Sequence, residues 1–211
     1  MKKIIYSAMI LSLMLATSCS KNKDDGTWNT SLGKARFATA QTWVISGNGI
    51  TQVWSDAVEI IGAEDTYNGG NETDGFRIDF RSNPDYKGNL FSWRAVVETA
   101  NICPAPWRVP TVDDFINLDK ALGGNGENRS NSEFVTFINA KYFGDWGGTF
   151  DGYTTTDGTL LRQGLWANYW SVTEGTTSQA RSLRFGTTSG FIFPQSFDSK
   201  SLGFTLRCVR D

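Results

Sequence analysis

The chain of 211 residues contains no histidine. Histidine is the commonest general base in enzymes and the commonest metal ligand in proteins. Its absence excludes serine–histidine and cysteine–histidine nucleophilic sites built within this chain. We therefore expect a protein that is not an enzyme, and we assign no catalytic residue, no cofactor and no metal ligand from the sequence.

A strong positive charge is also missing. The formal net charge is −2, and no basic cluster stands out. A nucleic-acid partner is therefore not expected, because phosphate recognition needs a basic patch. After residue 18 the chain also lacks an apolar run of about 20 residues, the length that a membrane-spanning helix requires.

The first eighteen residues have the features of an export signal. Two lysines precede an apolar run from Ile4 to Ala16, which is too short to span a bilayer as a helix. The run ends in Leu-Ala-Thr-Ser-Cys at Cys19, which resembles the lipobox, where small residues fit the signal peptidase and the thiol accepts diacylglycerol. We predict a lipoprotein signal peptide over residues 1–18 and a lipidated Cys19, with an ordinary signal peptide and a chance cysteine as the alternative.

Residues 19–27 are polar, which predicts a flexible tether. The segment Lys23-Asp24-Asp25 is similar to the surface-export signal of Bacteroidota lipoproteins, with a plain solvated linker as the alternative. We therefore expect a protein held at the outer membrane by the lipid on Cys19 and exposed at the cell surface. The periplasmic face is the open alternative.

Three cysteines are present, and the lipid takes Cys19. Cys103 and Cys208 remain in an exported, oxidising setting, where a pair of cysteines predicts one disulfide. The bond would close a loop of roughly 100 residues, worth roughly 4–5 kcal/mol in the chain-entropy model. Two buried thiols are the alternative.

Short apolar runs and turn residues predict a β-rich region over residues 28–85. Within it, residues 42–45 and 51–54 are separated by Gly-Asn-Gly, which is a hairpin signal. Residues 76–80 alternate apolar and polar side chains, as a half-buried strand does.

Helical spacing of apolar residues replaces the strand pattern in the middle of the chain. A short helix is predicted over residues 92–100, and a second one begins at Thr111, whose spacing to Asp114 is close to a capping box. Asp113 and Asp114 could in principle act as an acid–base pair, but acids in a first helical turn favour the helix dipole, so we predict capping. A third helix is predicted over residues 132–142.

The last part of the chain predicts strands at residues 169–173, 181–185, 191–193 and 204–209. On the last of these, Phe204, Leu206 and Cys208 share one face. Trp107 is predicted to lie buried beneath this strand. An order of strands, then helices, then strands favours an α+β domain over a parallel α/β sheet.

Four motifs occur in an order that resembles one family. They are Gly-Asn-Leu-Phe-Ser-Trp at 88–93, Ile-Cys-Pro-Ala-Pro-Trp-Arg-Val-Pro-Thr at 102–111, Asn-Tyr-Trp-Ser-Val-Thr-Glu at 168–174 and Gly-Phe-Thr-Leu-Arg-Cys-Val-Arg-Asp at 203–211. They resemble the "GxLYxW", "CPxGWRVPT", "YWSSTE" and "GFSVRCVRD" segments of the Fibrobacter succinogenes major paralogous domain, with Val172 in place of the usual serine. The resemblance covers residues 86–211.

This family occurs in lipoproteins and secreted proteins of Bacteroidota and Fibrobacter, and its activity is largely unassigned. Its helix-opening motif and terminal Arg-Cys-Val-Arg also resemble the formylglycine-generating and C-type-lectin-like group. That resemblance implies a compact C-type-lectin-like α+β domain, in which a cysteine pair joins the first helical region to the last strand. Cys103 and Cys208 would fill those places, and no cysteine remains for the two catalytic roles of formylglycine-generating enzymes.

C-type-lectin-like domains often bind through long loops among the late strands. Candidate ligand-binding residues here are the aromatic side chains of Trp146, Tyr153, Trp166 and Phe193. Aromatic rings can stack on sugar faces, with burial in the core as the alternative for each. The calcium-site triplets of sugar-binding C-type lectins are missing, and three acids in glycine-rich loops, Asp145, Asp151 and Asp157, are too scattered to predict a metal site.

The sequence therefore favours a non-catalytic surface module that binds a glycan or a protein. A structural accessory subunit of an outer-membrane assembly is the alternative. One contiguous exposed apolar patch would favour the accessory subunit, and aromatic side chains in a groove beside polar groups would favour a glycan binder.

Overall fold

The computed structural model describes residues 26–62, 78–79 and 88–211. The predicted signal peptide, Cys19 and nearly all of the tether lie outside these residues. Of the strand predicted over 76–80, only Ile78–Asp79 is described, and it forms strand β5. No helix in the described part is long and apolar enough to cross a membrane.

The first sheet is built around the long strand β4 (Ile50–Ile60). Its strands lie in the order β1 (Thr27–Thr30), β2 (Gly33–Phe37), β4 and β14 (Arg207–Arg210), and β3 (Thr42–Gly47) also pairs with β4. All of these pairings are antiparallel. The β3–β4 hairpin confirms the sequence prediction, because Asn48 and Gly49 have φ angles of 50° and 77°, the left-handed backbone that a tight hairpin turn needs.

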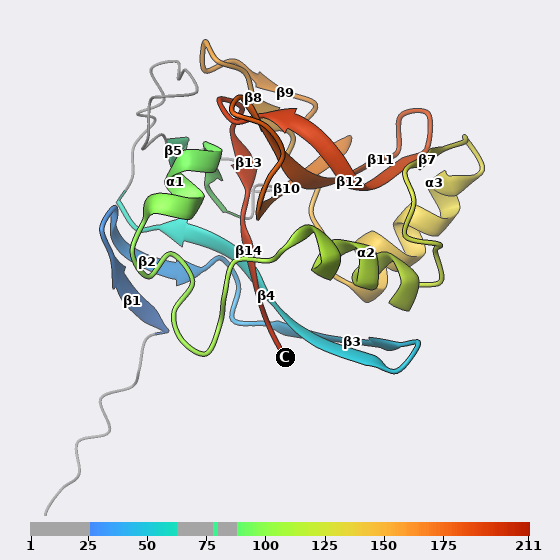
Figure 1. Ribbon diagram of the computed structural model, residues 1–211, viewed down its shortest axis with the longest axis horizontal. Helices are drawn as coiled ribbons and strands as arrows, with labels where there is room; N and C mark the ends of the chain where they lie inside the picture. The colour runs from blue at the N-terminus through green and yellow to red at the C-terminus, as the bar shows by residue number, and fades with distance from the viewer. Residues whose placement is uncertain (1–25, 63–77, 80–87) are drawn as a thin grey trace, which may run out of the picture.

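The second sheet contains the late strands (Figure 1). Its order is β5, β6 (Leu90–Phe91), β13 (Phe204–Thr205), β10 (Trp166–Glu174), β11 (Gln179–Gly186), β12 (Phe191–Ser199) and β7 (Arg129–Ser130). Neighbours are antiparallel except β10 and β13, which are parallel. A small ribbon of β8 (Tyr153–Thr154) and β9 (Leu160–Leu161) lies beside this sheet. The three strands predicted before residue 200 are confirmed, and each is longer than predicted.

The strand predicted over residues 204–209 is divided between the two sheets. β13 pairs in the second sheet and β14 in the first, and the chain passes between them at Leu206, whose carbonyl accepts a hydrogen bond from Val58 at 3.0 Å. Phe204, Leu206 and Cys208 are all buried. One short segment therefore joins both sheets.

The helices come from the middle of the chain. Ser92 caps α1 (Trp93–Glu98), and Thr111 caps α2 (Val112–Ala121), where the predicted capping box with Asp114 is confirmed. The third predicted helix is α-helical only over α3 (Phe134–Phe137) and continues as a π-helical segment, η1 (Ile138–Asp145). The apolar spacing did not separate these two geometries, because Ile138 and Tyr142 are buried on the inner side of η1.

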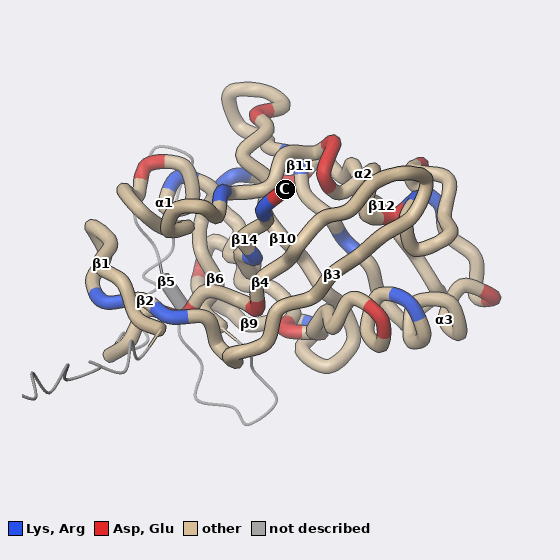
Figure 2. The backbone as a smooth tube through the Cα atoms, turned by 90° about the horizontal axis from the view of Figure 1, so that it is seen from below, with Lys and Arg blue, Asp and Glu red and all other residues tan. Residues whose placement is uncertain are grey.

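Two clusters of buried side chains form the core. One includes α1 and Trp170, and the other includes α2 and η1 with Trp54 and Trp146. The predicted disulfide between Cys103 and Cys208 is present and joins the segment after α1 to β14. The predicted α+β class is confirmed. Figure 2 shows that basic and acidic residues are interspersed along the described chain.

Trp107, which was predicted to lie buried beneath the strand that carries Cys208, is partly buried. Its indole packs against the cluster that contains Cys208, but part of it is exposed to solvent. Phe37 of β2 meets it edge-on with ring centres 5.5 Å apart, and the Arg210 guanidinium lies 4.7 Å from its ring centre. The predicted burial is therefore confirmed in part, since the ring packs against the Cys208 cluster and the rest of it faces solvent.

Candidate ligand pocket

A pocket with a volume of about 240 Å³ lies between the β3–β4 hairpin and the loop that follows η1. Two buried charged side chains, Asp56 and Arg207, line it together with the aromatic rings of Trp43 and Phe143. Gln41 contributes to its exposed rim. We call this feature the Asp56–Arg207 pocket.

Asp56 lies on β4 and is held by three donors from the segment that leads into β3. Its Oδ2 accepts hydrogen bonds from the Thr39 hydroxyl and, at 2.9 Å, from the Gln41 backbone N–H. Its Oδ1 accepts one from the Trp43 indole N–H at 3.0 Å. A carboxylate offers about four acceptor positions, and these three donors fill three of them.

Arg207 is the first residue of β14 and is only 2% exposed. Its Nε donates to the Ser55 carbonyl at 2.5 Å, and its Nη1 donates to the carbonyls of Trp146 and Gly147 at 3.1 and 3.2 Å. Its Nη2 is also buried, and no described residue accepts a hydrogen bond from it. The guanidinium is therefore fixed by three carbonyls, and protein atoms enclose its Nη2.

Burial disfavours the charged form of Arg207. Burial lowers the pKa of Arg207 to about 10, although Tyr169, Asp56 and Asp151 each favour the charged form. Among the described residues, no carboxylate oxygen lies within ion-pair distance of its guanidinium. A buried charge without a close partner is unfavourable, and in an accessible pocket it marks a candidate functional site.

Glycine shapes one wall of the pocket. Gly147 has a φ of +67°, and a Cβ atom placed on it would lie 2.1 Å from the Trp43 indole. The loop after η1 can therefore pass against the Trp43 ring only because this residue has no side chain. Phe143, which also lines the pocket, is 52% exposed and stacks on Phe150 with ring centres 5.6 Å apart.

The structure corrects the role proposed for Trp146. Its side chain has no exposed surface and packs against Trp54 and Tyr169 with ring centres 5.4 and 5.0 Å away. The Arg207 guanidinium lies 4.3 Å from its ring centre. Its ring therefore has no free face for a ligand, because the core and Arg207 cover it, and Trp146 supports the pocket from beneath.

The other three aromatic candidates lie close together outside this pocket. Tyr153 stacks on Trp166 at 6.0 Å, and Phe191 connects Trp166 to Phe193 with ring centres 5.0 and 5.1 Å apart. All three candidates are partly exposed. The guanidinium groups of two arginines each lie 5.2 Å from the Trp166 ring centre, so protein cations already occupy its surroundings. A ligand-binding role for Tyr153, Trp166 and Phe193 stays a prediction.

The sequence analysis did not select Asp56 or Arg207. A signal was present, since each is a charged residue inside an apolar stretch of a strand, Val-Trp-Ser-Asp-Ala-Val in β4 and Leu-Arg-Cys-Val in β14. A charge at such a position is seldom buried unless it is paired or used. Only the pairing of β4 with β14 brings the two charges to one pocket.

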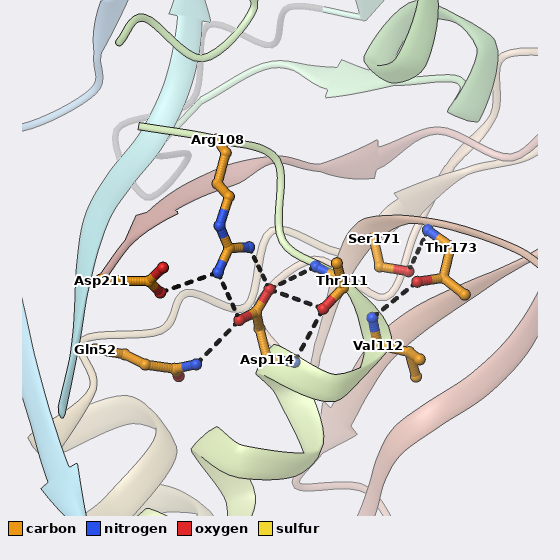
Figure 3. A network of polar contacts seen from close by, with 8 residues as sticks. All are labelled: Gln52, Arg108, Thr111, Val112, Asp114, Ser171, Thr173 and Asp211. Atoms are coloured by element: carbon orange, nitrogen blue, oxygen red, sulfur yellow. Dashed lines mark hydrogen bonds and ion pairs between the residues drawn. The ribbon is translucent and has the colours of Figure 1, made fainter. Parts of the chain in front are cut away.

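Figure 3 shows a second polar network, in which Arg108 of the Trp-Arg-Val-Pro-Thr motif binds Asp114. The guanidinium contacts both carboxylate oxygens at 2.6 and 3.0 Å and reaches Asp211 at 3.1 Å. Asp114 also accepts hydrogen bonds from Gln52 and Thr111, at 3.1 and 2.7 Å. The ion pair raises the pKa of Arg108 above its ordinary value. Each carboxylate oxygen of Asp114 has at least two donors, so this network connects α2 to β4 and the chain end.

The three acids considered as calcium ligands have other partners. Asp145 pairs with Lys141 at 2.7 Å, and Asp151 is buried against the hydroxyls of Thr149 and Thr205. The third acid, Asp157, lies in an exposed turn and accepts a hydrogen bond from the Thr155 hydroxyl. Within the described ranges, no three His, Cys, Asp or Glu side chains form a group that could hold a metal ion.

Comparison with known proteins identifies the family. A model of the family described as Fibrobacter succinogenes major domain matches residues 37–210. Comparisons with curated proteins and with solved structures gave no match. The matched region includes every residue of the Asp56–Arg207 pocket as well as the four motifs at the C-terminal side, except for the last residue. This chain belongs to the Fibrobacter succinogenes major domain family.

Proposed function

We propose that this protein is a non-catalytic binding module, held at the outer membrane by lipid on Cys19 and facing the cell surface. It takes a glycan or protein ligand in the Asp56–Arg207 pocket. One observation carries the proposal: two buried side chains of opposite charge, Asp56 and Arg207, line a pocket of about 240 Å³ together with the aromatic rings of Trp43 and Phe143.

The composition of the pocket supports binding in preference to catalysis. Binding pockets combine aromatic walls with a few polar groups in fixed positions, which Trp43, Asp56 and Arg207 provide. The nearby hydroxyl of Tyr169 keeps its proton at neutral pH, because burial and Asp151 raise the pKa of Tyr169 to about 12. The volume is below the roughly 300–1,000 Å³ of sites for drug-sized ligands, so a single terminal group of a larger ligand fits best.

The lipid anchor and the fold group belong to the same proposal. The lipobox at Cys19 and the Lys23-Asp24-Asp25 segment support a surface-exposed lipoprotein. The disulfide from the segment after α1 to the last strand supports a C-type-lectin-like domain, a group in which ligand binding is common. Fold alone does not assign an activity, so the pocket carries the argument.

An accessory subunit of a membrane assembly has less support. The exposed large apolar side chains of the described part lie on several elements, among them Val44 on β3, Phe143 on η1 and Phe197 on β12. Apolar residues exposed one at a time are ordinary, whereas a partner surface needs a contiguous patch.

The proposal is tested by binding of the full-length protein to arrays of glycans and host matrix proteins. Phe143→Ala and Gln41→Ala remove one wall and one rim group of the pocket, and we expect each to weaken binding at least tenfold. Matched controls are Phe197→Ala, at a phenylalanine that is 46% exposed on β12, and Gln179→Ala, at an exposed glutamine on β11. The controls should bind as the unmodified protein does.

Two results would contradict the proposal. One is binding that none of the pocket variants changes, and the other is a stable membrane complex whose assembly depends on Phe197 in preference to Phe143. Protease treatment of intact cells tests the orientation separately: digestion of the domain is expected, and full protection would place it in the periplasm.

A further inference from the structure

We infer that the ligand of this domain is an extended segment of another protein, which adds a strand to the open edge of β3 beside the Asp56–Arg207 pocket. The inference rests on the proposed function and narrows its ligand to one class. It follows from the direction of the backbone groups along β3, from the exposure of that strand and from the position of the pocket.

Strand β3 has a partner on one side only. In the first sheet it pairs with β4 and with no other described strand, which leaves its outer edge open (Figure 1). Gly47 and Ile50 enclose a turn of two residues, so they form a hydrogen-bonded pair, and the hydrogen bonding then alternates along the two strands. Trp43 and Ile45 therefore direct their backbone N–H and C=O groups toward β4.

The backbone groups of Thr42, Val44 and Ser46 point away from β4. An independent contact agrees with this direction, since the carbonyl of Ser55, which lies opposite Thr42, accepts its hydrogen bond from Arg207 on the other side of β4. Within the described part of the chain, no group bonds the main-chain N–H or C=O of these three β3 residues. Each of them offers one donor and one acceptor to a neighbouring chain.

The edge of β3 lacks the features that usually prevent pairing. Edge strands in soluble proteins are protected by proline, by charged side chains or by bulges. The strand Thr-Trp-Val-Ile-Ser-Gly has no proline and no charge, and its register with β4 runs without a shift. Val44 is 63% exposed, and Thr42 and Ser46 are exposed as well. A regular, uncharged and exposed edge is a surface that another strand can extend.

The Asp56–Arg207 pocket lies beside this edge. Trp43 belongs to β3 and lines the pocket, and so do Thr39 and Gln41 in the segment that leads into the strand. A chain that pairs with β3 presents every second side chain on the face that carries Trp43. One such side chain can enter the pocket, whose volume of about 240 Å³ and aromatic walls suit an apolar or aromatic group. Main-chain hydrogen bonds would then supply affinity, and the pocket would supply specificity.

A segment of another protein fits these features better than a glycan or a second copy of this chain. A glycan has no regular row of amide groups to match the edge. A second copy paired through its own β3 has no side chain to insert, because Trp43 and Ile45 already pack in their own core. The contact would also be small, since β3 has six residues and a stable interface buries roughly 1,000 Å² or more.

The first test uses the full-length protein and capped peptides as long as β3, in which threonine alternates with valine, phenylalanine or tyrosine. For each peptide that binds, every residue is N-methylated in turn. N-methylation at alternate residues removes the donors that face β3, and we expect it to weaken binding at least tenfold. At the intervening residues it should change binding less than threefold. Equal effects at all positions would overturn the inference.

A variant of β3 gives a second readout. Val44→Pro removes one donor that faces outward, and proline is tolerated on an edge strand where its nitrogen faces away from the partner. Peptide binding should weaken at least tenfold. The matched control Val44→Thr keeps the donor at the same exposed position and should change binding less than threefold. Near-ultraviolet circular dichroism establishes that both variants are folded.

Amide hydrogen exchange tests the edge without a variant. In the free protein the amides of Val44 and Ser46 should exchange much faster than those of Trp43 and Ile45, and bound peptide should slow the first two. Protection of Val44 and Ser46 in the dilute free protein would overturn the inference, because the edge would then be covered. Protection that appears only as the protein concentration rises would identify a second copy as the occupant and would also overturn it.

The outcomes separate the inference from the proposed function. Glycan binding that Phe143→Ala weakens and Val44→Pro leaves unchanged would overturn the added strand and keep the pocket as a binding site. Peptide binding that Val44→Pro weakens and Phe143→Ala leaves unchanged would keep the added strand and overturn the role of the pocket. Absence of binding to every peptide of the set would overturn the inference, and absence of binding to glycans and matrix proteins as well would overturn both.

Discussion

Arg108 and Arg207 differ in their environment and in the partners of their guanidinium groups. Arg108 is partly exposed and forms a two-point ion pair with Asp114, supplemented by Asp211. Arg207 is almost completely buried, contacts carbonyls in place of a carboxylate and keeps one nitrogen without an acceptor among the described residues. The first arrangement pairs the guanidinium with carboxylates, and the second encloses it among backbone carbonyls at the wall of a pocket.

The difference shows where function is to be sought in this domain. The Trp-Arg-Val-Pro-Thr motif is the most distinctive sequence feature, yet its arginine and its threonine act on the cap of α2. The Asp56–Arg207 pocket has no sequence motif of its own. Incomplete hydrogen bonding at a buried charge was the observation that located it, because native proteins satisfy most buried polar groups.

The largest expected effect on stability comes from removing the disulfide, which lies next to the segments that carry the two arginines. The disulfide joins Cys103 to Cys208, the residue after Arg207, and the Arg108 segment pairs with Val209. Replacing both cysteines by alanine should lower the free energy of unfolding by roughly 4–5 kcal/mol, because a loop closed over 105 positions is released in the unfolded chain. Denaturant unfolding measures this loss, and unchanged stability would show that the bond does not form.

A smaller effect on the free energy of unfolding should distinguish the contributions of the two arginines. Arg207→Met removes the donors for the carbonyls of Ser55, Trp146 and Gly147, and we expect a loss of about 2–4 kcal/mol. Arg108→Met should cost about 1–2 kcal/mol, because that side chain is 41% exposed and Asp114 keeps its bonds from Thr111. Thermal and denaturant unfolding give the ranking. An Arg207→Met protein as stable as the parent would contradict the structural part of its role.

The smallest effect concerns pH at the Arg108 pair. Burial alone would raise the pKa of Asp114, but hydrogen bonds from Arg108 and Thr111 outweigh it, and the folded-state pKa lies below the ordinary value. The stabilisation by this carboxylate is therefore complete above its ordinary pKa of about 3.9 and is lost as the pH falls through the lower folded-state value.

Asp114→Asn should therefore cost about 1–2 kcal/mol at pH 7 and much less at the acid end. Unfolding curves at several pH values, compared with the exposed-acid control Asp145→Asn, measure this difference. The same loss of stability at every pH would mean that the charge of Asp114 does not contribute.

The sequence by itself determined the features that depend on neighbours along the chain. The cap at Thr111, the turn at Asn48 and Gly49 and the late strands follow from local hydrogen bonding and from side-chain period. The choice of Cys103 and Cys208 as partners also followed, because one of three cysteines had a different expected role. The family motifs predicted the domain to which the chain belongs.

Only the tertiary structure decided the features that depend on residues far apart. It divided residues 204–209 between two sheets, buried Trp146 in the core and left Trp107 partly exposed. Local patterns do not contain this information, because a strand looks the same whichever sheet it joins and an aromatic residue looks the same in a core or a groove. Asp56 and Arg207 became one pocket for the same physical reason: the pairing of β4 with β14 brings together two buried charges that no local pattern connects.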